Sequence, residues 1–402
     1  MGTDDQARGE ARGEGVLAGI RVIEIGGLGP APFAAMMLAD HGAEVLRVER
    51  PGKTHTEGAA VQDDLVGWDV LSRSRLSAGV DLKHPDGRAL VARLAVDADV
   101  FIEGFRPGVA ERLGIGPDEL CGANDRLVYG RMTGWGRTGP LAQRAGHDIN
   151  YVAVAGAQAH IGRAGQPPTP PLNLVGDFGG GGMMLAFGIC AALVQRSISG
   201  RGQVVDAAMV DGAALLMAPL FGAHDSGYWS DERGTNLLDS GAPFYDCYEC
   251  ADGGFVSVGA LEPQFYTALL EGLGLEPGSE GGADLPTQND QPRWPELRAA
   301  FGARFLTRTR DEWAEHFADR DGCVAPVLTM GEAPRHPHLS EWGTFTTVGA
   351  ITQPAPAPRF SRTPAAVPTP PQVAGANTDE VLARWGLEAD EIGRLRAAGA
   401  VN

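Results

Sequence analysis

The sequence predicts an α/β protein with a large Rossmann-like, parallel-sheet domain and a smaller α+β domain. A chain of 402 residues with 43% hydrophobic side chains is long enough for two cores. Short apolar segments alternate with helical segments over the first half, which is the pattern of parallel β-α-β units. A hairpin pattern follows near residue 250, and antiparallel pairing after a parallel sheet indicates a second, smaller domain.

The alternation begins at residue 20, and the strand segments are apolar enough to be covered on both faces of a sheet. The predicted strands are residues 20–25, 44–48, 77–82, 100–102 and 127–132. Helices are expected from about residue 32 to 40 and from residue 86. A further helix is expected to open at the glycine run 179–182 and reach about residue 196. The long apolar stretch 209–221 predicts a buried connecting helix.

The pattern changes after this connector. Residues 244–250 and 255–258 flank Ala251-Asp252-Gly253-Gly254, whose residue types favour a hairpin turn. A proline-rich stretch, 353–371, is expected to run extended, and two short helices are expected near residues 379–385 and 389–397. The predicted organisation is a disordered N-terminal extension (1–16), a large domain (17–206), a helical connector (207–235), a small domain (236–335) and a return segment whose helices pack on the large domain (336–402).

The charge balance excludes some classes of partner. The net charge is −18, from 33 basic and 51 acidic residues, which argues against binding to a phosphate backbone. We expect no transmembrane helix, because no apolar run approaches the length needed to span a bilayer. Residues 1–16 lack the basic start and apolar stretch of a secretory signal, and residues 399–402 carry no peroxisomal or retention address. We therefore expect a cytoplasmic protein that binds neither nucleic acid nor membranes.

The cysteines predict neither a disulfide framework nor a metal site. All five are far apart except Cys247 and Cys250, which indicates a reducing compartment. These two form one C-x-x-C on a predicted strand, where residues three apart face opposite sides. Because no second cysteine pair exists, we expect no metal.

A glycine-rich turn, residues 26–32, follows the first predicted strand. It lies where a dinucleotide-binding fold carries G-x-G-x-x-G, and Glu49 matches the acid that binds a ribose about twenty residues later. The third glycine position is Pro32, however, which does not allow the same close packing of helix on strand. The turn therefore favours a Rossmann-like topology without a dinucleotide.

Three titratable residues stand in contexts typical of sites. His147 lies in a loop beyond the strand 127–132, Asp177 precedes the glycine run, and Glu262 follows the hairpin. Ligands of open α/β sheets bind at the carboxyl ends of the strands, where the loop of His147 is expected. Taken alone, these contexts favour structural roles, since a loop histidine is more often a surface or structural residue, Asp177 fits a helix N-cap, and Glu262 before a proline fits a helix start.

Several segments resemble the class III (formyl-CoA transferase-like) CoA-transferase superfamily: LAGIRVIE at 17–24, GAEVLRVERP at 42–51 and VDLK at 80–83. Within it, GHDINY at 146–151, LNLVGDFG at 172–179 and EPQFY at 262–266 resemble the α-methylacyl-CoA racemases. The resemblance extends from about residue 17 to residue 371 and includes three motifs in order, each with one of the titratable residues.

The resemblance implies that the protein racemises 2-methylacyl-CoA thioesters by two-base transfer of the α-proton through an enolate. His147 and Asp177 would carry the protons and Glu262 would orient His147. The implied CoA contacts are Arg50, Val80, Asp81, Leu82, Lys83, Gly104, Phe105, Arg106, Arg112, Gly146, His147, Asp148, Ile149, Asn150 and Tyr151. The resemblance also implies an interlocked homodimer and no cofactor beyond the CoA moiety of the acyl-CoA substrate.

The residue types suit this chemistry. A carbon acid that loses its proton on one face and regains it on the other needs two groups of opposite protonation, and histidine titrates near neutral pH. The enolate oxygen needs a hydrogen-bond donor, for which the backbone N–H of Asp177, at the expected helix start, is suited. Arginine pairs at 47/50, 73/75 and 106/112 are expected to bind the CoA phosphates.

Two other functions remain open. A CoA-transferase of the same superfamily would use Asp177 as a nucleophile that forms acyl intermediates. A non-enzymatic CoA-binding protein would need none of the three titratable residues. The pair of His147 and Glu262 favours the racemase, because acyl transfer does not require a second proton relay.

Overall fold

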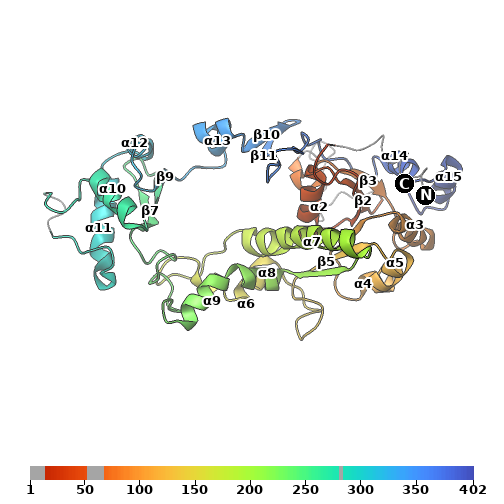
Figure 1. Ribbon diagram of the computed structural model, residues 1–402, viewed down its shortest axis with the longest axis horizontal. Coiled ribbons are helices and arrows are strands. Elements are labelled where there is room, and N and C mark those ends of the chain that lie inside the picture. The colour runs from red at the N-terminus through yellow and green to blue at the C-terminus, as the bar shows by residue number, and fades with distance from the viewer. Residues whose placement is uncertain (1–13, 52–67, 280–283) are drawn as a thin grey trace. The chain divides into compact units, whose positions relative to one another are not determined.

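The computed structural model describes residues 14–51, 68–279 and 284–402. The chain forms two compact units, one of residues 1–155, 172–216 and 341–402, the other of residues 156–171 and 217–340 (Figure 1). Residues 156–171, predicted within the large domain, group with the second unit, and the predicted connector 207–235 divides between the two units after residue 216. Most of the predicted N-terminal extension, residues 1–13, lies outside the described residues.

A six-stranded parallel sheet forms the centre of the first unit, in the order β3-β2-β1-β4-β5-β6. The strands are β1 Arg21–Ile25, β2 Glu44–Glu49, β3 Leu76–Gly79, β4 Val100–Glu103, β5 Val128–Thr133 and β6 Val204–Ala208. This is the doubly wound order in which ligands bind at the carboxyl ends of the strands, where the order reverses between β1 and β4. The five predicted strands and the predicted α/β class are confirmed, except that the third strand ends at Gly79 and not at residue 82, and strand β6 completes the sheet.

Helices cover both faces of this sheet. Alternate residues of β1 pack on opposite sides, Ile23 in one core cluster and Val22 in the other. The first cluster includes residues of α3, α5, α14 and α15, and the second includes residues of α2 and α7. The helices of this unit are α2 Pro30–Asp40, α3 Pro85–Val96, α4 Val109–Arg112, α5 Pro117–Ala123, α6 Asp148–Val154, η4 Leu174–Met183, α7 Met184–Ser199, α8 Met209–Leu216, α14 Thr378–Arg384 and α15 Ala389–Ala397. A hairpin of β10 Phe345–Val348 and β11 Ile351–Pro354 precedes the last two helices.

Three arginines that were expected to bind phosphates are instead buried structural residues. Arg47 pairs with Glu49 at 2.6 Å, Arg75 pairs with Glu24, and Arg73 binds Asp40 through Nε at 3.0 Å. Arg73 also donates to the carbonyl of Pro354 at 2.7 Å, which ties α2 to the returning chain. Their guanidinium groups are already neutralised inside the protein, so the prediction for these three residues is wrong.

Replacing Arg75 with alanine is expected to lower the free energy of unfolding by about 3–5 kcal/mol, the usual cost of leaving one buried charge without its partner. The side chains of Arg75 and Glu24 are both fully buried, so water cannot replace the lost partner. The matched control is Arg384→Ala, which breaks an exposed pair with Glu380 on α14 and is expected to cost under about 1 kcal/mol. Urea denaturation followed by circular dichroism measures both, and equal losses would contradict the prediction.

The helical stretch Leu174–Ser199 corrects two predictions. It begins as a π-helix, η4, at Leu174 and continues as α7, so the glycine run lies inside it and not at its start. It is also the one helix among the described residues that is long and apolar enough to cross a membrane, although 44% of its apolar window is buried in the protein. The prediction that no apolar run is long enough to span a bilayer is therefore wrong. A helix that packs on a sheet in a protein core can be equally long and apolar.

The second unit contains a three-stranded antiparallel sheet of β7 Tyr245–Glu249, β8 Phe255–Gly259 and β9 Val324–Pro326. The predicted hairpin is confirmed as β7 and β8. The helices of this unit are α9 Ala218–Asp225, α10 Pro263–Leu273, α11 Trp294–Phe305 and α12 Arg310–His316, and α13 Pro337–Trp342 spans the boundary between the two units in the sequence. Aromatic residues, among them Phe244, Phe301 and Phe305, fill its core.

The predicted connecting helix over residues 209–221 is two helices. α8 ends at Leu216 and α9 starts at Ala218, with Pro219 in its first turn. A proline has no N–H and its ring clashes with the preceding turn, so the helix cannot continue through it. α8 buries Met209, Gly212 and Ala213, whereas α9 has no residue buried within the chain, so the prediction of a buried connector is wrong for its second half.

The five cysteines are free thiols. Cys247 is exposed and Cys250 is buried, as expected for residues that face opposite sides of a strand and its extension.

Candidate active site

A pocket of about 220 Å³ lies at the carboxyl edge of the parallel sheet, where the strand order reverses. Turns after three strands form its walls: residues 27–31 after β1, residues 104–107 after β4 and residues 132–135 from the end of β5. The fourth wall is the segment 142–147, together with Tyr151 of α6. The glycine-rich turn therefore borders this pocket, at the sheet edge where ligands of such folds bind.

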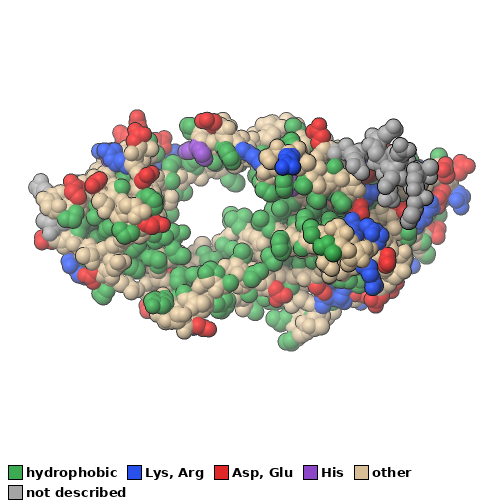
Figure 2. All heavy atoms as spheres, in the orientation of Figure 1, with side chains coloured by type: hydrophobic (Ala, Val, Ile, Leu, Met, Phe, Trp, Pro, Cys, Tyr) green, Lys and Arg blue, Asp and Glu red, His purple; other side chains and the backbone are tan. Residues whose placement is uncertain are grey.

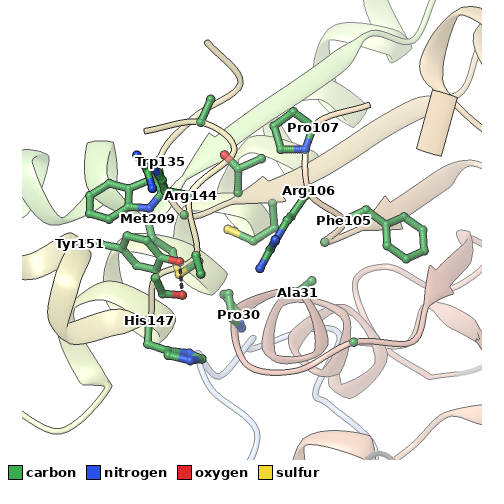
Figure 3. Close-up of a pocket in the computed structure, with 18 of the residues that line it drawn as sticks. Pro30, Ala31, Phe105, Arg106, Pro107, Trp135, Arg144, His147, Tyr151 and Met209 are labelled. Atoms are coloured by element: carbon green, nitrogen blue, oxygen red, sulfur yellow. Dashed lines mark hydrogen bonds between the residues drawn. The ribbon is translucent and has the colours of Figure 1, made fainter. Parts of the chain in front are cut away.

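His147 lies at this pocket, at the amino end of α6. Its backbone is extended and its N–H donates to Asn150 Oδ1 at 3.0 Å, which fixes the start of the helix. The residue is exposed, and Figure 3 shows its ring at the rim of the pocket, below Tyr151. A histidine held by its backbone with its ring exposed can reach a bound substrate.

Asp177 lies in the first turn of η4, next to the pocket wall. Its Oδ2 would be 3.3 Å from a Cβ on Gly29, the residue between wall residues Leu28 and Pro30, and Gly29 has a φ of 70° that favours glycine. Asn173 Nδ2 donates to the same oxygen at 3.2 Å. Because Asp177 lies in the helix and Asn173 holds the N-cap position, the N-cap alternative for Asp177 is wrong.

Burial and three neighbouring side chains shift the pKa of Asp177. Burial raises the pKa of this carboxyl, the Asn173 amide lowers it, the charge of Asp148 raises it and His147 lowers it. The structure thus brings His147 and Asp177 within electrostatic reach of each other, although 30 positions separate them in the chain. A carboxyl with a raised pKa is a better proton carrier near neutral pH than an exposed one.

Asp148 is buried behind these two residues and does not line the pocket. Its Oδ2 accepts hydrogen bonds from the backbone N–H groups of Gly176 (2.6 Å) and Asp177 (2.7 Å). The N–H of Asp177 is therefore already bonded, and the prediction that it stabilises the enolate oxygen is wrong. The CoA contact implied for Asp148 stays a prediction.

The glycine run allows the close packing that places Asp177. A Cβ on Gly180 would lie 2.7 Å from the backbone nitrogen of Ala213 on α8, and one on Gly182 would lie 2.8 Å from the carbonyl oxygen of Pro30 on α2. Side chains at these positions would push η4 away from both helices. The run is thus a helix-packing device, and it holds η4 against the pocket wall.

Arg106 points into the pocket from the loop after β4, opposite Tyr151 and Trp135 (Figure 3). Tyr151 donates to the carbonyl of Gly146 at 2.5 Å and packs edge-on against Trp135. Burial and the charge of Asp177 raise the pKa of Tyr151, and Arg106 lowers it. An exposed guanidinium in a pocket with aromatic walls suits an anionic group of a ligand.

The loop that carries Arg106 is held from below by a buried carboxylate. Glu103 accepts from the N–H of Phe105 at 2.6 Å and lies 3.6 Å from Arg131. Burial raises the pKa of Glu103 to about 7, against the opposing effects of the Phe105 N–H and Arg131. Arg131 in turn binds Glu111 at 2.7 Å, so this network fixes the loop between β4 and α4.

The other implied CoA contacts divide into two groups. Those that line this pocket are Gly104, Phe105, Arg106, Gly146, His147 and Tyr151. Those that do not are Arg50, Val80, Asp81, Leu82, Lys83, Arg112, Asp148, Ile149 and Asn150. The side chain of Val80 is in the core and its backbone pairs with Val401, and the CoA contact implied for it stays a prediction. Arg50, Lys83 and Arg112 are exposed, so their assignment stays a prediction.

Several pocket residues were missed by the sequence reasoning, namely Thr133, Trp135, Arg144 and Met209. Trp135 and Thr133 come directly from the end of β5, so the rule that ligands bind at strand ends contains a signal for them. Arg144 precedes the GHDINY motif by two residues. Met209 begins α8 and has no local signal, because only the fold of the chain brings it to the pocket.

Glu262 belongs to the second unit, where it is exposed at the N-cap of α10 with Pro263 in the first turn. This helix start is the structural alternative that the sequence left open. It is compatible with a second role because the Glu262 carboxylate makes no capping hydrogen bond.

Among the described residues there is no group of three or more histidine, cysteine, aspartate or glutamate side chains arranged for a metal ion.

Comparisons with known proteins agree with this architecture. The model of CoA-transferase family III matches residues 17–378. The chain is 47% identical to the alpha-methylacyl-CoA racemase of Mus musculus and 44% identical to that of Homo sapiens, in each case over 95% of this chain and 96% of the relative. A crystal structure of a CAIB/BAIF family protein from Brucella suis matches the fold with a TM-score of 0.80 at 23% identity, covering 92% of this chain and all of that one. The chain belongs to CoA-transferase family III.

Proposed function

We propose that the protein interconverts the R and S forms of 2-methylacyl-CoA thioesters by removing and returning the α-proton through an enolate. The observation that carries the proposal is the pairing of two proton carriers, His147 and Asp177, beside one pocket at the carboxyl edge of the sheet. The high identity to two racemases over nearly the whole chain supports the same reaction. The reaction needs no group beyond the CoA moiety of the substrate.

In this mechanism the α-carbon lies between the two side chains. One removes the proton from one face while the other, already protonated, delivers a proton to the opposite face. Burial raises the pKa of the Asp177 carboxyl, so this group takes up a proton more readily than an exposed aspartate does. We assign Glu262 the role of orienting His147, supplied across the interface of a dimer.

The test follows the α-proton directly. A single-enantiomer 2-methylacyl-CoA ester, incubated with the protein in D₂O, should yield both epimers with deuterium at the α-carbon and without a carboxylic acid co-substrate. Mass spectrometry and chiral separation measure both outcomes. The ester series should include straight, branched and arylpropionyl chains, since the acyl group is not specified by the site.

The alternative is a CoA-transferase, the activity after which the family is named. The Asp177 carboxylate would then attack the thioester carbonyl, the C–S bond would break to release CoA thiolate, and a mixed anhydride would remain on Asp177; activity would require an acceptor acid. Inactivation by hydroxylamine that depends on acyl-CoA, without uptake of deuterium, would overturn the racemase proposal in favour of this one.

Arg106→Ala is expected to raise the KM for acyl-CoA about tenfold, the loss of one charge-assisted hydrogen bond of about 1.5 kcal/mol. The kcat should change little, because an anion contact binds substrate and transition state alike. Arg384→Ala, on the surface of α14, is the matched control and should leave both constants unchanged. A fall in kcat with an unchanged KM would show that Arg106 acts at the reacting carbon.

We also propose that the protein is a homodimer. Apolar side chains recur along one stripe of α7 and its preceding turn, with exposed fractions of 52% for Met183, 68% for Phe187, 63% for Val194 and 78% for Ile198. Hydrophobic side chains gather over this helix in Figure 2. Exposed apolar stripes of this length are typical of subunit interfaces.

Phe187→Asp is therefore expected to convert the dimer to a monomer, because the interface would bury an unpaired charge. Sedimentation velocity at micromolar concentration measures the change. Val367→Asp, which places the same charge at a residue 78% exposed but far from this stripe in the sequence, is the control and should stay dimeric. A wild-type protein that sediments as an active monomer would refute the dimer.

A further inference from the structure

Asp148 is a buried carboxylate that joins the two segments carrying the proposed proton carriers. It is the first residue of α6, directly after His147, and only 6% of it is exposed. Its Oδ2 accepts from the N–H groups of Gly176 at 2.6 Å and Asp177 at 2.7 Å, in the first turn of η4. These bonds connect the amino ends of two helices that are distant in the sequence.

The fit between these helix ends depends on a glycine. A Cβ on Gly176 would lie 2.6 Å from Asp148 Oδ2 and 3.2 Å from Val152 Cγ2, so any side chain would displace the carboxylate or α6. The second oxygen of Asp148, Oδ1, is buried and has no hydrogen-bond partner within the described part of the chain. A buried oxygen without a partner costs free energy, so the role of this carboxylate lies in what it positions more than in stability.

The connection acts directly on the reacting groups. His147 precedes Asp148 by one peptide bond, and its N–H is held by Asn150 at 3.0 Å. Asp177 contributes its own N–H to the carboxylate. A shift of α6 relative to η4 therefore changes the separation of the His147 ring and the Asp177 carboxyl.

We propose that Asp148 is a positioning residue, whose carboxylate sets the separation and facing of His147 and Asp177 without contacting the substrate. The inference rests on the proposed proton-transfer function. Two groups that must address opposite faces of one carbon tolerate little error, since a misplacement of about 1 Å costs on the order of 100-fold in rate.

Asp148 also affects the titration of Asp177. The groups that influence the pKa of Asp177 are His147 and Asp148 from α6 and Asn173 from its own helix, with Tyr151 of α6 and Arg106 nearby. The charge of Asp148 raises the pKa of Asp177. Replacing Asp148 by the neutral asparagine therefore lowers that pKa, and the acid limb of the pH profile moves to lower pH in the direction that uses Asp177 as the base.

The experiment compares three variants in the D₂O assay, with circular dichroism to measure the folded fraction. Asp148→Ala should lower kcat on the order of 100-fold per folded protein, with KM within about threefold, because alignment and not binding is lost. Gly176→Ala should give the same selective loss while it keeps the carboxylate. Asp148→Asn retains an oxygen that accepts both N–H groups, so its kcat should be at least tenfold higher than that of Asp148→Ala. The acid limb of its pH profile should lie at lower pH than that of the wild type.

The matched control is Asp99→Ala at the opposite edge of the sheet, where the carboxylate accepts from the Arg21 N–H at 2.8 Å and pairs with Arg196 at 2.9 Å. It should lower stability and leave kcat unchanged. If Asp148→Ala does not fold, Gly176→Ala and Asp148→Asn decide the question. A kcat within threefold of wild type in the folded variants, or a loss confined to KM, overturns the inference, whereas an inactive wild-type protein would refute the proposed function.

Discussion

Replacing His147 with alanine is expected to lower the rate of racemisation about 1,000-fold, the usual contribution of one acid/base group. The loss should be asymmetric in isotope exchange. The enantiomer whose α-proton faces Asp177 can still lose it and regain deuterium on the same face. Its mirror image should exchange at a much lower rate, because the group that faces its α-proton is gone.

Chiral separation with mass spectrometry distinguishes these outcomes in one experiment. The control is His338→Ala, which removes an exposed histidine of the second unit and should leave both exchange rates unchanged. Equal exchange of both enantiomers by the His147 variant, at near wild-type rate, would show that another group carries the proton.

Asp177→Asn is expected to cause a loss of about the same size, 100- to 1,000-fold, with the opposite isotope pattern. The substitution keeps the backbone N–H that binds Asp148, so the packing of α6 on η4 should persist. Only the ability to carry a proton is lost. The enantiomer whose α-proton faces His147 should then exchange without inversion.

The pH dependence provides an independent check on Asp177. Burial raises the pKa of its carboxyl, so the acid limb for the direction that uses Asp177 as the base should lie above the ordinary aspartate value of about 3.9. Activity in that direction falls as the pH drops through this raised pKa. Asp118→Asn, an exposed residue of α5, is the control and should leave the limb in place. An unshifted limb in the Asp177 variant would contradict the assignment.

Local patterns were sufficient for most elements of the fold. The apolar segments that became β1, β2, β4 and β5 are recognisable because strands covered on both faces need continuous hydrophobic side chains. The hairpin of the second unit was recognisable from its turn residues. Pro219 carried a signal for the break between α8 and α9 that the apolar composition of the stretch concealed.

The candidate site was predicted less evenly. His147 and Asp177 were identified through motifs of a known family, and the structure places both beside the pocket. Arg73 and Arg75 were misassigned, because an arginine that binds a phosphate and one that binds a buried carboxylate look the same in a sequence. The role of the glycine run was also misread, since a helix start and a helix-packing surface both require glycine.

The sequence by itself therefore determined the order and type of most secondary-structure elements, the family, and the two residues that we propose as proton carriers. Only the tertiary structure decided which charges are buried, which N–H groups are already bonded, and how Asp148 connects His147 to Asp177. The physical reason is the range of the interactions. Periodicity, turns and caps depend on residues a few positions apart, whereas ion pairs and carboxylate–amide bonds join residues tens of positions apart and exist only once the sheet has brought them together.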